Sequence, residues 1–472
     1  MAEVWYLRHI RDLEHKLRKA EEELKKEKEQ REKSDKENKR LKDEIARFAL
    51  SKDAKRPKFP DYSLKKHEND LKKGDTKKST GRISFEEKLK TVQFEKNVYP
   101  EGVSPEKCGL RSQRIVTHLK NGQKEVWLYR IHRKSWGKVT GKLPQVYGKS
   151  EYGVEVLVAL SFLVYVLKLS QDQAREVMMF FSGIEVKKSE IESLFNQLGK
   201  AWEKEFNVLS TLILSSSIVH VDETGWKIGK ENCYTWIFKS TSQTLLLYGE
   251  KRNEEVLDRI LPRGIFKGIG ITDCYKMYEK YFNVAQKCWA HFLRKAIKLK
   301  LFFPEKKKYQ IFFKELYEIF VDAKGLKEKK DSKANEVLKL EEKIQKICTL
   351  KTKKLGKRTT KDFREFVNLQ KNLMRNIKDL FTFVLNPDVN PTNNDAEQNL
   401  RHVAKSRNNY QTSKTKKGAK RHSIIASVLF SLRQNLKNFS LTNVTAEVMK
   451  SQLEGKSLFQ NQIEESFETL IA

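Results

Sequence analysis

The sequence predicts a multidomain α+β protein. Its 472 residues are enough for two or three domains with separate cores. Helical patterns lie on both sides of residues 211–300, the later one rich in Lys and Leu, and the central stretch has the pattern of strands. Helical and strand-rich stretches that are segregated in this way are typical of α+β architecture.

The chain is strongly basic. Lys and Arg number 95 against 62 Asp and Glu, a formal net charge of +33. The positive charges of such an excess repel one another in a compact protein, and they favour binding to a polyanionic partner. The longest apolar run, 156–167, has 12 residues, whereas a membrane span needs about 20. We therefore expect a nucleic-acid partner and no membrane. The alternative is a generally basic protein without such a partner.

The cysteines argue against a disulfide framework. All five are scattered, and no two of them form a CxxC pair. This usage is typical of a reducing cytoplasm.

Residues 1–48 form a charged stretch through which a heptad seam can be drawn. The seam is apolar at both ends, with Ile10, Leu13 and Leu17 near its start and Leu41, Ile45 and Phe48 near its end. Its middle is polar. The pattern predicts a weak coiled coil with a second copy, and hence a homodimer or higher oligomer. The alternative is a single solvated helix.

The next two segments differ in apolar content. Residues 49–110 are Lys-rich and poor in large apolar side chains, which predicts a flexible basic linker that either follows a phosphate backbone or is an inert tether. Residues 111–145 hold two alternating stretches around Asn121-Gly122, a pair that supplies the positive φ angles of a type I′ turn. We expect a β-hairpin there, either a DNA accessory or purely structural.

Residues 146–210 contain the helix start and stop signals that are typical of a helix-turn-helix. Ser170 and Gln173 form a capping box, Gly183 stops the first helix, and a helical pattern resumes at Lys188. In such a unit the second helix enters the major groove, which would place Lys187, Lys188 and Asn196 on DNA. The alternative is an ordinary αα-hairpin.

Residues 211–300 predict a mixed sheet. Strands are expected at 217–228, 234–240, 245–250, 268–273 and 284–289, with a helix at 253–260. Three hairpin-linked strands, a helix and two further strands describe a ribonuclease-H-like core. Residues 301–386 are Lys- and Leu-rich and predict an all-α insertion, 387–437 predict two further helices, and 438–472 are assigned to a tail.

Three acidic residues stand in distinctive positions. Asp222 and Asp273 each end an apolar run that predicts a strand, and Glu397 lies at the start of a predicted helix. Carboxylates placed in this way can converge on two hard cations about 3.5–4 Å apart, which favour oxygen ligands. Two such ions clamp the attacking and leaving oxygens of a phosphodiester exchange. We therefore predict that all three are catalytic and bind two Mg²⁺ or Mn²⁺ ions, 387–437 holding the catalytic helix.

Neighbouring residues are assigned from spacing. Strand alternation sends Glu223 to the side opposite Asp222. Asn394 is expected to cap the catalytic helix, and Arg401, one turn beyond Glu397, pairs with that residue or holds a phosphate. Cys288 and His291 have half of a zinc-site spacing with no second pair nearby, so zinc is not expected.

Four ordered blocks resemble the insertion-sequence-66 transposase family. They are His220-Val-Asp-Glu-Thr-Gly-Trp226, Thr272-Asp-Cys-Tyr-Lys-Met-Tyr278, Lys287-Cys-Trp-Ala-His-Phe-Leu-Arg-Lys295 and Asn393-Asn-Asp-Ala-Glu-Gln-Asn-Leu-Arg401. The resemblance covers roughly residues 150–437. It implies a DDE-type transposase with a ribonuclease-H-like catalytic core, acting on the ends of its own mobile element. The chain departs from the family in having only Cys108 where many members have a zinc-binding segment, and Cys274 where Gly is usual.

The predicted function is cleavage of element ends and transfer of 3′-OH strands into double-stranded target DNA. The alternatives are a metal nuclease of the same fold that does not join strands, and a catalytically silent DNA-binding derivative. Besides the helix-turn-helix residues, we assign DNA contact to His291, Arg294, Arg401, Arg407, Lys416 and Lys417, although His291 also fits a structural role. The setting expected from the resemblance is the nucleoid of a prokaryotic cytoplasm, with possible helper proteins from the same element.

Overall fold

The computed structural model describes residues 83–328, 333–349, 359–410 and 412–471. The predicted coiled coil at 1–48 and the first part of the predicted linker, 49–82, lie outside these residues. Within the described ranges, no helix combines the length and apolar character that a bilayer crossing requires.

A three-stranded module begins the described chain, and it corrects the predicted linker. Helix α3 (Phe85–Leu89) and strand β1 (Phe94–Val98) lie within the range assigned to linker, so that prediction was wrong for residues 83–110. β1 pairs in parallel with β3 (Gln123–Lys134), and Phe94 stacks on Trp127 with ring centroids 4.9 Å apart. Aromatic stacking and strand pairing therefore hold a stretch whose high Lys content suggested a tether.

The predicted hairpin is confirmed. β2 (Cys108–Lys120) pairs antiparallel with β3, and a short helix, η1 (Pro105–Lys107), precedes it. Asn121 and Gly122 at the turn have φ angles of 50° and 79°, as a type I′ turn requires.

A group of helices follows. α4 (Val154–Ser161) continues into the π-helical turn η2 (Phe162–Val166), and then come α5 (Gln171–Ser182), α6 (Lys188–Ala201) and α7 (Glu203–Leu214). The capping box of Ser170 and Gln173 opens α5 as predicted, and Gly183, with φ of 66°, ends it.

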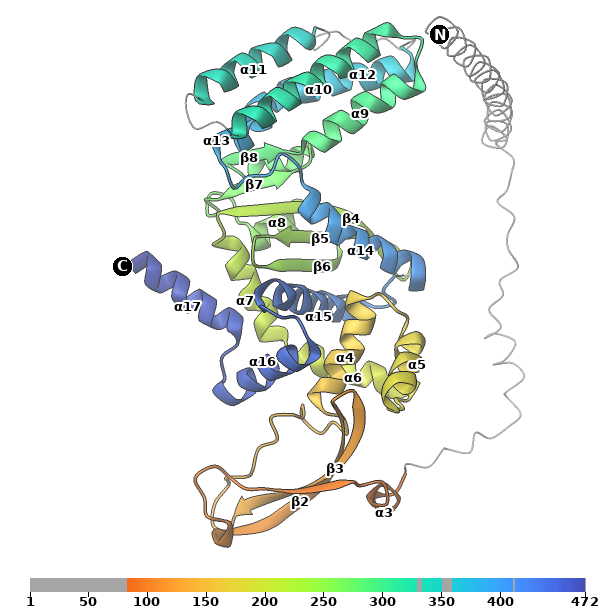
Figure 1. The fold of residues 1–472 in the computed structure, drawn as a ribbon, viewed down its shortest axis with the longest axis vertical. Coiled ribbons are helices and arrows are strands. Elements are labelled where there is room, and N and C mark those ends of the chain that lie inside the picture. Colours follow the sequence, from red (N-terminus) through yellow and green to blue (C-terminus); the bar gives the residue numbers. More distant parts are fainter. Residues whose placement is uncertain (1–82, 329–332, 350–358, 411, 472) are drawn as a thin grey trace, which may run out of the picture. The chain divides into compact units, whose positions relative to one another are not determined.

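The central sheet has five strands in the order β6-β5-β4-β7-β8 (Figure 1). β4 (Ile218–Ile228), β5 (Glu231–Lys239) and β6 (Thr244–Glu250) are antiparallel neighbours. β7 (Ile269–Thr272) and β8 (Val284–Lys287) continue the sheet in parallel with β4. Helix α8 (Glu254–Ile260) connects β6 to β7, and η3 (Lys276–Lys280) connects β7 to β8. These positions match the mixed sheet that the sequence predicts.

A helical insertion with its own core follows β8. It comprises α9 (Trp289–Phe302), α10 (Lys307–Glu328), α11 (Lys333–Ile347), α12 (Lys361–Arg375), η4 (Ile377–Leu380) and α13 (Thr382–Leu385). Buried aromatic side chains such as Trp289, Phe312 and Phe366 form this core, which also includes Ile271 of β7.

The chain then returns to the sheet. α14 (Asn394–Tyr410) contacts β4 and β5, and α15 (Lys416–Asn435) lies along β6 (Figure 1). The stretch assigned only to a tail forms α16 (Leu441–Glu454) and α17 (Leu458–Ile471). Val444, Val448 and Phe459 from these helices are buried in the largest hydrophobic core, so the end of the chain belongs to the folded unit.

Candidate active site

Two predicted carboxylates lie at the same level of adjacent strands. Asp222 is inside β4, and Asp273 directly follows β7. The two strands run in parallel, with His220 opposite Ile271. Asp222 and Asp273 each come two residues later, so strand pairing brings together two residues that are far apart in the sequence.

The faces of β4 separate Asp222 from Glu223, as predicted. Asp222 lies opposite Ile237, which packs in the core that α14 and α15 cover, whereas Glu223 lies opposite Trp236 on the other face. Directly opposed residues of an antiparallel pair share a face. Asp222 is therefore on the side of the sheet where α14, the helix of Glu397, is packed.

Glu397 lies in the first turn of α14, and Asn393 anchors this end of the helix. The buried Asn393 side chain bonds His220 Nδ1 at 2.9 Å through Oδ1 and donates from Nδ2 to the Val221 carbonyl at 2.9 Å. Its backbone N–H donates to Cys288 Sγ at 3.2 Å. The capping role predicted for Asn394 is corrected here, since Asn394 is already the first residue of the helix and Asn393 ties the helix start to β4.

Negative charge is concentrated around Asp222. Burial raises the pKa of its carboxyl to about 7, and the negative charges of Glu223, Asp273 and Glu397 act in the same direction. One carboxyl oxygen accepts the backbone N–H of Glu223 at 2.9 Å, which only partly offsets this effect. A carboxyl in such surroundings is ionised more readily when a cation is nearby.

Glu223 is held by two residues that spacing alone did not single out. Arg252 approaches one carboxyl oxygen at 2.5 Å from Nη2, and the hydroxyl of Tyr278 donates to the other. The Arg252 guanidinium also stacks over the ring of Tyr275, 4.0 Å from its centroid, and the backbone N–H of Tyr275 donates to Asp273 Oδ1 at 2.8 Å. This network links β4 to the loop that carries Asp273.

Glu397 contacts a second group of side chains, all from the start of α9. Arg294 Nη2 lies 2.7 Å from its Oε1, His291 Nδ1 lies 3.6 Å away and Cys288 Sγ lies 4.0 Å away. Burial lowers the pKa of His291 below its usual value, and the positive charge of Arg294 adds to this effect. Near neutral pH the imidazole is therefore uncharged beside the Arg294–Glu397 ion pair.

In the described part of the chain, one group of side chains lies close enough together to hold a metal ion. Donor atoms of Cys288, His291 and Glu397 lie within 4.8 Å of one another, so the fold supplies a third ligand to the half-site that the sequence showed. However, Arg294 already neutralises Glu397, and burial raises the pKa of the Cys288 thiol. Among the described residues, Asp222, Asp273 and Glu397 do not form so close a group, and the Arg294 ion pair occupies Glu397 in this set too. Their carboxylate oxygens are nevertheless the ligand type that hard cations prefer.

The residues predicted to contact DNA from α6 have different surroundings. Lys187 and Lys188 are exposed at the start of the helix, where Lys188 pairs with Asp172 at 2.8 Å. Asn196 instead accepts a hydrogen bond from Arg421 of α15 at 3.0 Å, so its side chain points towards the protein.

The remaining predicted DNA contacts lie on three helices. His291 and Arg294 are beside Glu397 on α9. Arg401 is exposed on α14, and the pairing with Glu397 considered for it is made by Arg294. Arg407 donates to the Gly225 carbonyl at 2.8 Å and so fastens α14 to β4. Lys416 and Lys417 are exposed in the first turn of α15.

Sequence reasoning missed Asn393, Arg252 and Tyr278. Asn393 is adjacent to Asn394, and only the position of the first helical turn distinguishes the two. Tyr278 lies inside one of the four sequence blocks, so it could have been selected. Arg252 has no signal in the sequence, because its role depends on how the loop after β6 folds back onto β4.

A comparison with known families gives a match. The model described as "Transposase IS66 family" matches residues 149–421, a range that contains Asp222, Asp273 and Glu397. A comparison with curated proteins found no match. Since the family match spans more than half of the 472 residues, the chain belongs to the IS66 family of transposases.

Proposed function

We propose that the chain is a DDE-type DNA transposase that cleaves the ends of its element and joins them to target DNA. The observation that carries this proposal is that Asp273 and Glu397 lie near enough to Asp222 for their charges to raise its pKa, which burial and these acidic neighbours bring to about 7. Perturbed carboxyls of this kind are concentrated at functional sites.

The sheet supports a ribonuclease-H-like catalytic core. Three antiparallel strands are followed by two parallel ones, and the first carboxylate lies on the central strand β4. The second lies after the adjacent strand β7, and the third is on a helix that packs across β4 and β5. Helices α9 to α13 lie between the second and third carboxylates in the chain, which supports the all-α insertion expected at 301–386.

The oxygen donors suit two divalent ions, for which Glu397 would exchange its ion pair with Arg294. Asp222, Asp273 and Glu397 would hold Mg²⁺ or Mn²⁺, since excess negative charge and oxygen donors are what these ions require. Bound there, the ions would lower the pKa of the attacking water and stabilise the charge that develops on the phosphate.

The reaction proposed has two phosphodiester exchanges. Water attacks the phosphate at the element end, and the broken P–O bond leaves a free 3′-OH. That hydroxyl then attacks a phosphate of the target, forming a new bond and releasing a target 3′-OH. In this scheme Asn393 positions the helix of Glu397, and the network of Glu223 and Arg252 positions the loop of Asp273.

The basic side chains around the site have a role in holding strands. Arg294 is 56% exposed although it pairs with Glu397, so it is accessible to a phosphate. Arg401, Lys416 and Lys417 are exposed on the two helices that follow. Lys187 and Lys188 are exposed at the position where a helix-turn-helix would contact DNA. The proposal therefore includes α5 and α6 as a helix-turn-helix.

A strand-transfer assay tests the function. Purified full-length chain, Mg²⁺ and DNA carrying the element end should give nicked ends and joined products. Asp222→Asn, Asp273→Asn and Glu397→Gln should each reduce both products by at least about 100-fold, whereas Asp388→Asn, an exposed acid just before α14, should leave them unchanged.

Three other outcomes would contradict the proposal. Full strand transfer by Asp222→Asn or Glu397→Gln would remove the assigned site. Cleavage without joining would favour a metal nuclease of the same fold. DNA binding with neither activity would favour a catalytically silent derivative. The homodimer, helper proteins and location at the nucleoid stay predictions, since the seam that suggests pairing lies outside the described residues.

A further inference from the structure

A short loop closes the three-stranded module at the end away from the Asn121-Gly122 turn. We call residues 133–141 the finger. Arg133 and Thr140 form an antiparallel bridge, and the backbone N–H of Lys134 donates to the Val139 carbonyl at 3.1 Å. The N–H of Ser135 donates to the Lys107 carbonyl at 2.9 Å, which ties the finger to the segment before β2. The finger is therefore a tight, hydrogen-bonded turn.

The finger presents an indole to solvent. The Trp136 side chain is 91% exposed, the most exposed of the large apolar side chains among the described residues. By contrast, Trp127 in the same module stacks on Phe94, and Trp202, Trp226, Trp236 and Trp289 are buried. A large aromatic surface held at the tip of an ordered turn suggests a partner with a flat apolar face.

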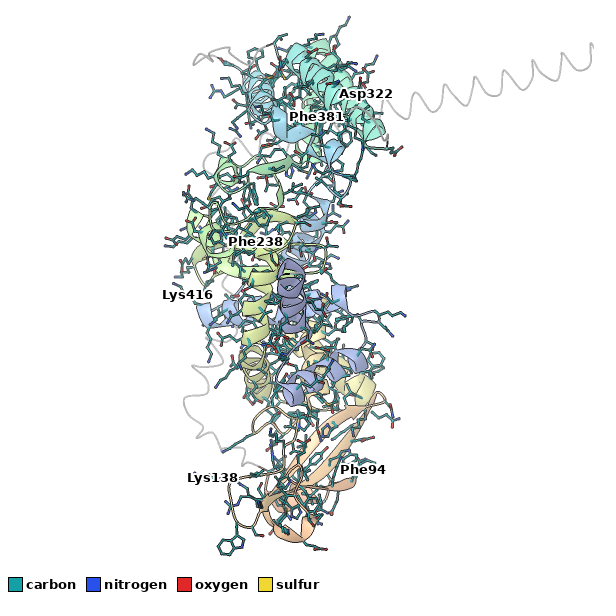
Figure 2. The ribbon with its side chains drawn as sticks, turned by 90° about the vertical axis from the view of Figure 1, so that its left-hand side faces the viewer. Phe94, Lys138, Phe238, Asp322, Phe381 and Lys416 are labelled. Atoms are coloured by element: carbon teal, nitrogen blue, oxygen red, sulfur yellow. The ribbon has the colours of Figure 1, made fainter. Side chains whose placement is uncertain are left out.

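Positive charge surrounds this indole. Between residues 107 and 142 there are ten basic residues and one acid, Glu125. Six of the ten are exposed at the finger end of the module: Lys107, Arg111, Arg133, Lys134, Lys138 and Lys142. None of these six pairs with a carboxylate within the described part of the chain. Figure 2 shows Lys138 and Phe94 on this module.

We propose that the finger binds DNA by stacking Trp136 on an unpaired base while the surrounding cations contact the flanking phosphates. An aromatic ring needs the flat face of a base, which an intact duplex hides and a gap, a frayed end or a single strand offers. The choice of DNA rests on the proposed function, but the binding surface is separate from the three carboxylates and requires no catalysis.

Binding assays on the full-length chain in EDTA test this inference. Fluorescence anisotropy would compare a labelled blunt duplex, the same duplex with a short gap, and the single strand. Trp136→Ala should weaken binding to gapped and single-stranded DNA by about tenfold, with blunt-duplex binding changed less than about twofold. Trp136→Phe should restore most of the loss. Leu110→Ala, an apolar side chain 54% exposed nearby, is the matched control and should bind as the unchanged chain does.

The salt dependence of binding distinguishes the contribution of the lysines from that of the Trp136 indole. Replacing Lys134 and Lys138 together by Ala should reduce the slope of log affinity against log salt by about 1.4 on single strands, or about 0.7 for each phosphate that a lysine no longer neutralises. Trp136→Ala should leave that slope unchanged, because stacking releases no counterions.

Several results would overturn the proposal. One is that Trp136→Ala binds each of the three DNAs with the same affinity as the unchanged chain does. Another is an equal loss on blunt and gapped DNA. A third is that Trp136→Ala shifts the protein from dimer to monomer in sedimentation but does not change DNA binding. That result would make the finger a contact between copies of the chain. If strand transfer fails while the Trp136 effect on gapped DNA persists, the catalytic proposal is wrong and the finger proposal stands.

Discussion

Within the proposed site, the surroundings of Asp222 disfavour the ionised form of its carboxyl most strongly. Its carboxyl is largely buried and three other acids raise its pKa further, while the residues that the structure describes offer it a single backbone N–H donor. Arg294 neutralises Glu397 and Arg252 neutralises Glu223, but no such cation lies on Asp222 among the described residues. Without a cation, the folded protein therefore binds a proton here at pH values where the unfolded chain has released it.

This difference predicts a pH dependence of stability. A carboxyl whose pKa rises from 3.8 to about 7 on folding stabilises the protein at low pH, and that stabilisation is lost as the pH rises from about 4 through 7. In EDTA, the contribution of this carboxyl to the free energy of unfolding should therefore fall over this range by an amount on the order of 2–4 kcal/mol.

Asp222→Asn removes the titration and is the comparison that checks this prediction. The difference in unfolding free energy between this variant and the unchanged chain should shift in favour of the variant as the pH rises. Added Mn²⁺ should stabilise the unchanged chain more at pH 8 than at pH 6, because cation and proton compete for the same carboxyl. A difference that stays constant from pH 4 to 8 would contradict the raised pKa.

At the scale of elements, α15 protects an edge of the sheet. Ser423, Ser427 and Ser431 recur every fourth residue, and their hydroxyls accept the backbone N–H groups of Tyr248, Leu246 and Thr244 at 2.8–3.0 Å. Edge strands otherwise present unpaired N–H groups that promote aggregation. The buried serines thus allow a helix to complete the hydrogen bonding of β6.

Ser427→Ala tests the contribution of this ladder. The substitution leaves the buried Leu246 N–H without its acceptor, which should lower the free energy of unfolding by about 1–3 kcal/mol in urea titrations. Hydrogen exchange at the Leu246 amide should accelerate. Ser193→Ala on the exposed face of α6 serves as the control and should change stability by less than about 0.5 kcal/mol. Equal effects of the two substitutions would show that the ladder does not stabilise the edge.

The elements also show which features a sequence can predict. Local signals worked: the Asn121-Gly122 turn, the Ser170 capping box, the Gly183 stop and the strand positions of the central sheet all depend on neighbours in the chain. β1 was missed because its stability comes from pairing with β3, about 30 residues away, and not from its own composition. For the serines of α15 the sequence predicted only a helix, since their acceptor role depends on β6.

The same distinction applies to the site. Residue type, context and the family resemblance selected Asp222, Asp273 and Glu397, whose catalytic role stays a prediction, and strand alternation separated Glu223 from Asp222 as the pairing of β4 with β5 shows. The partners that hold these acids come from distant segments: Arg294 lies 103 positions before Glu397, and Asn393 lies 172 after Val221. Such pairs are determined by packing between elements, for which a single sequence carries no direct signal.

At the scale of the whole described unit, both edges of the central sheet are closed by segments that flank α14 in the chain. Before α14, η4 and α13 bond to the edge strand β8: the Gln286 side chain donates to the Leu380 carbonyl at 3.1 Å and accepts the Phe383 N–H at 2.9 Å. After α14, the serines of α15 bond to β6. The helix that carries Glu397 is thus fixed from both sides, which links the helical insertion to the geometry of the site.

Gln286→Leu tests this link, because it keeps a similar side-chain volume but removes both hydrogen bonds. The Leu380 carbonyl keeps its hydrogen bond from Trp289 Nε1 at 2.6 Å, but the Phe383 N–H is left unpaired in the core, so the free energy of unfolding should fall by about 1–3 kcal/mol. Hydrogen exchange should increase in 380–397 more than in β4 and β5, since the insertion and the start of α14 lose their attachment to β8. Strand transfer under conditions where the variant is still folded should fall at least about tenfold, because small displacements of a catalytic group are costly. Gln310→Ala, an exposed glutamine on α10, should affect neither quantity. If Gln286→Leu is destabilised but retains full strand transfer while folded, the insertion is attached to the sheet without determining the position of Glu397.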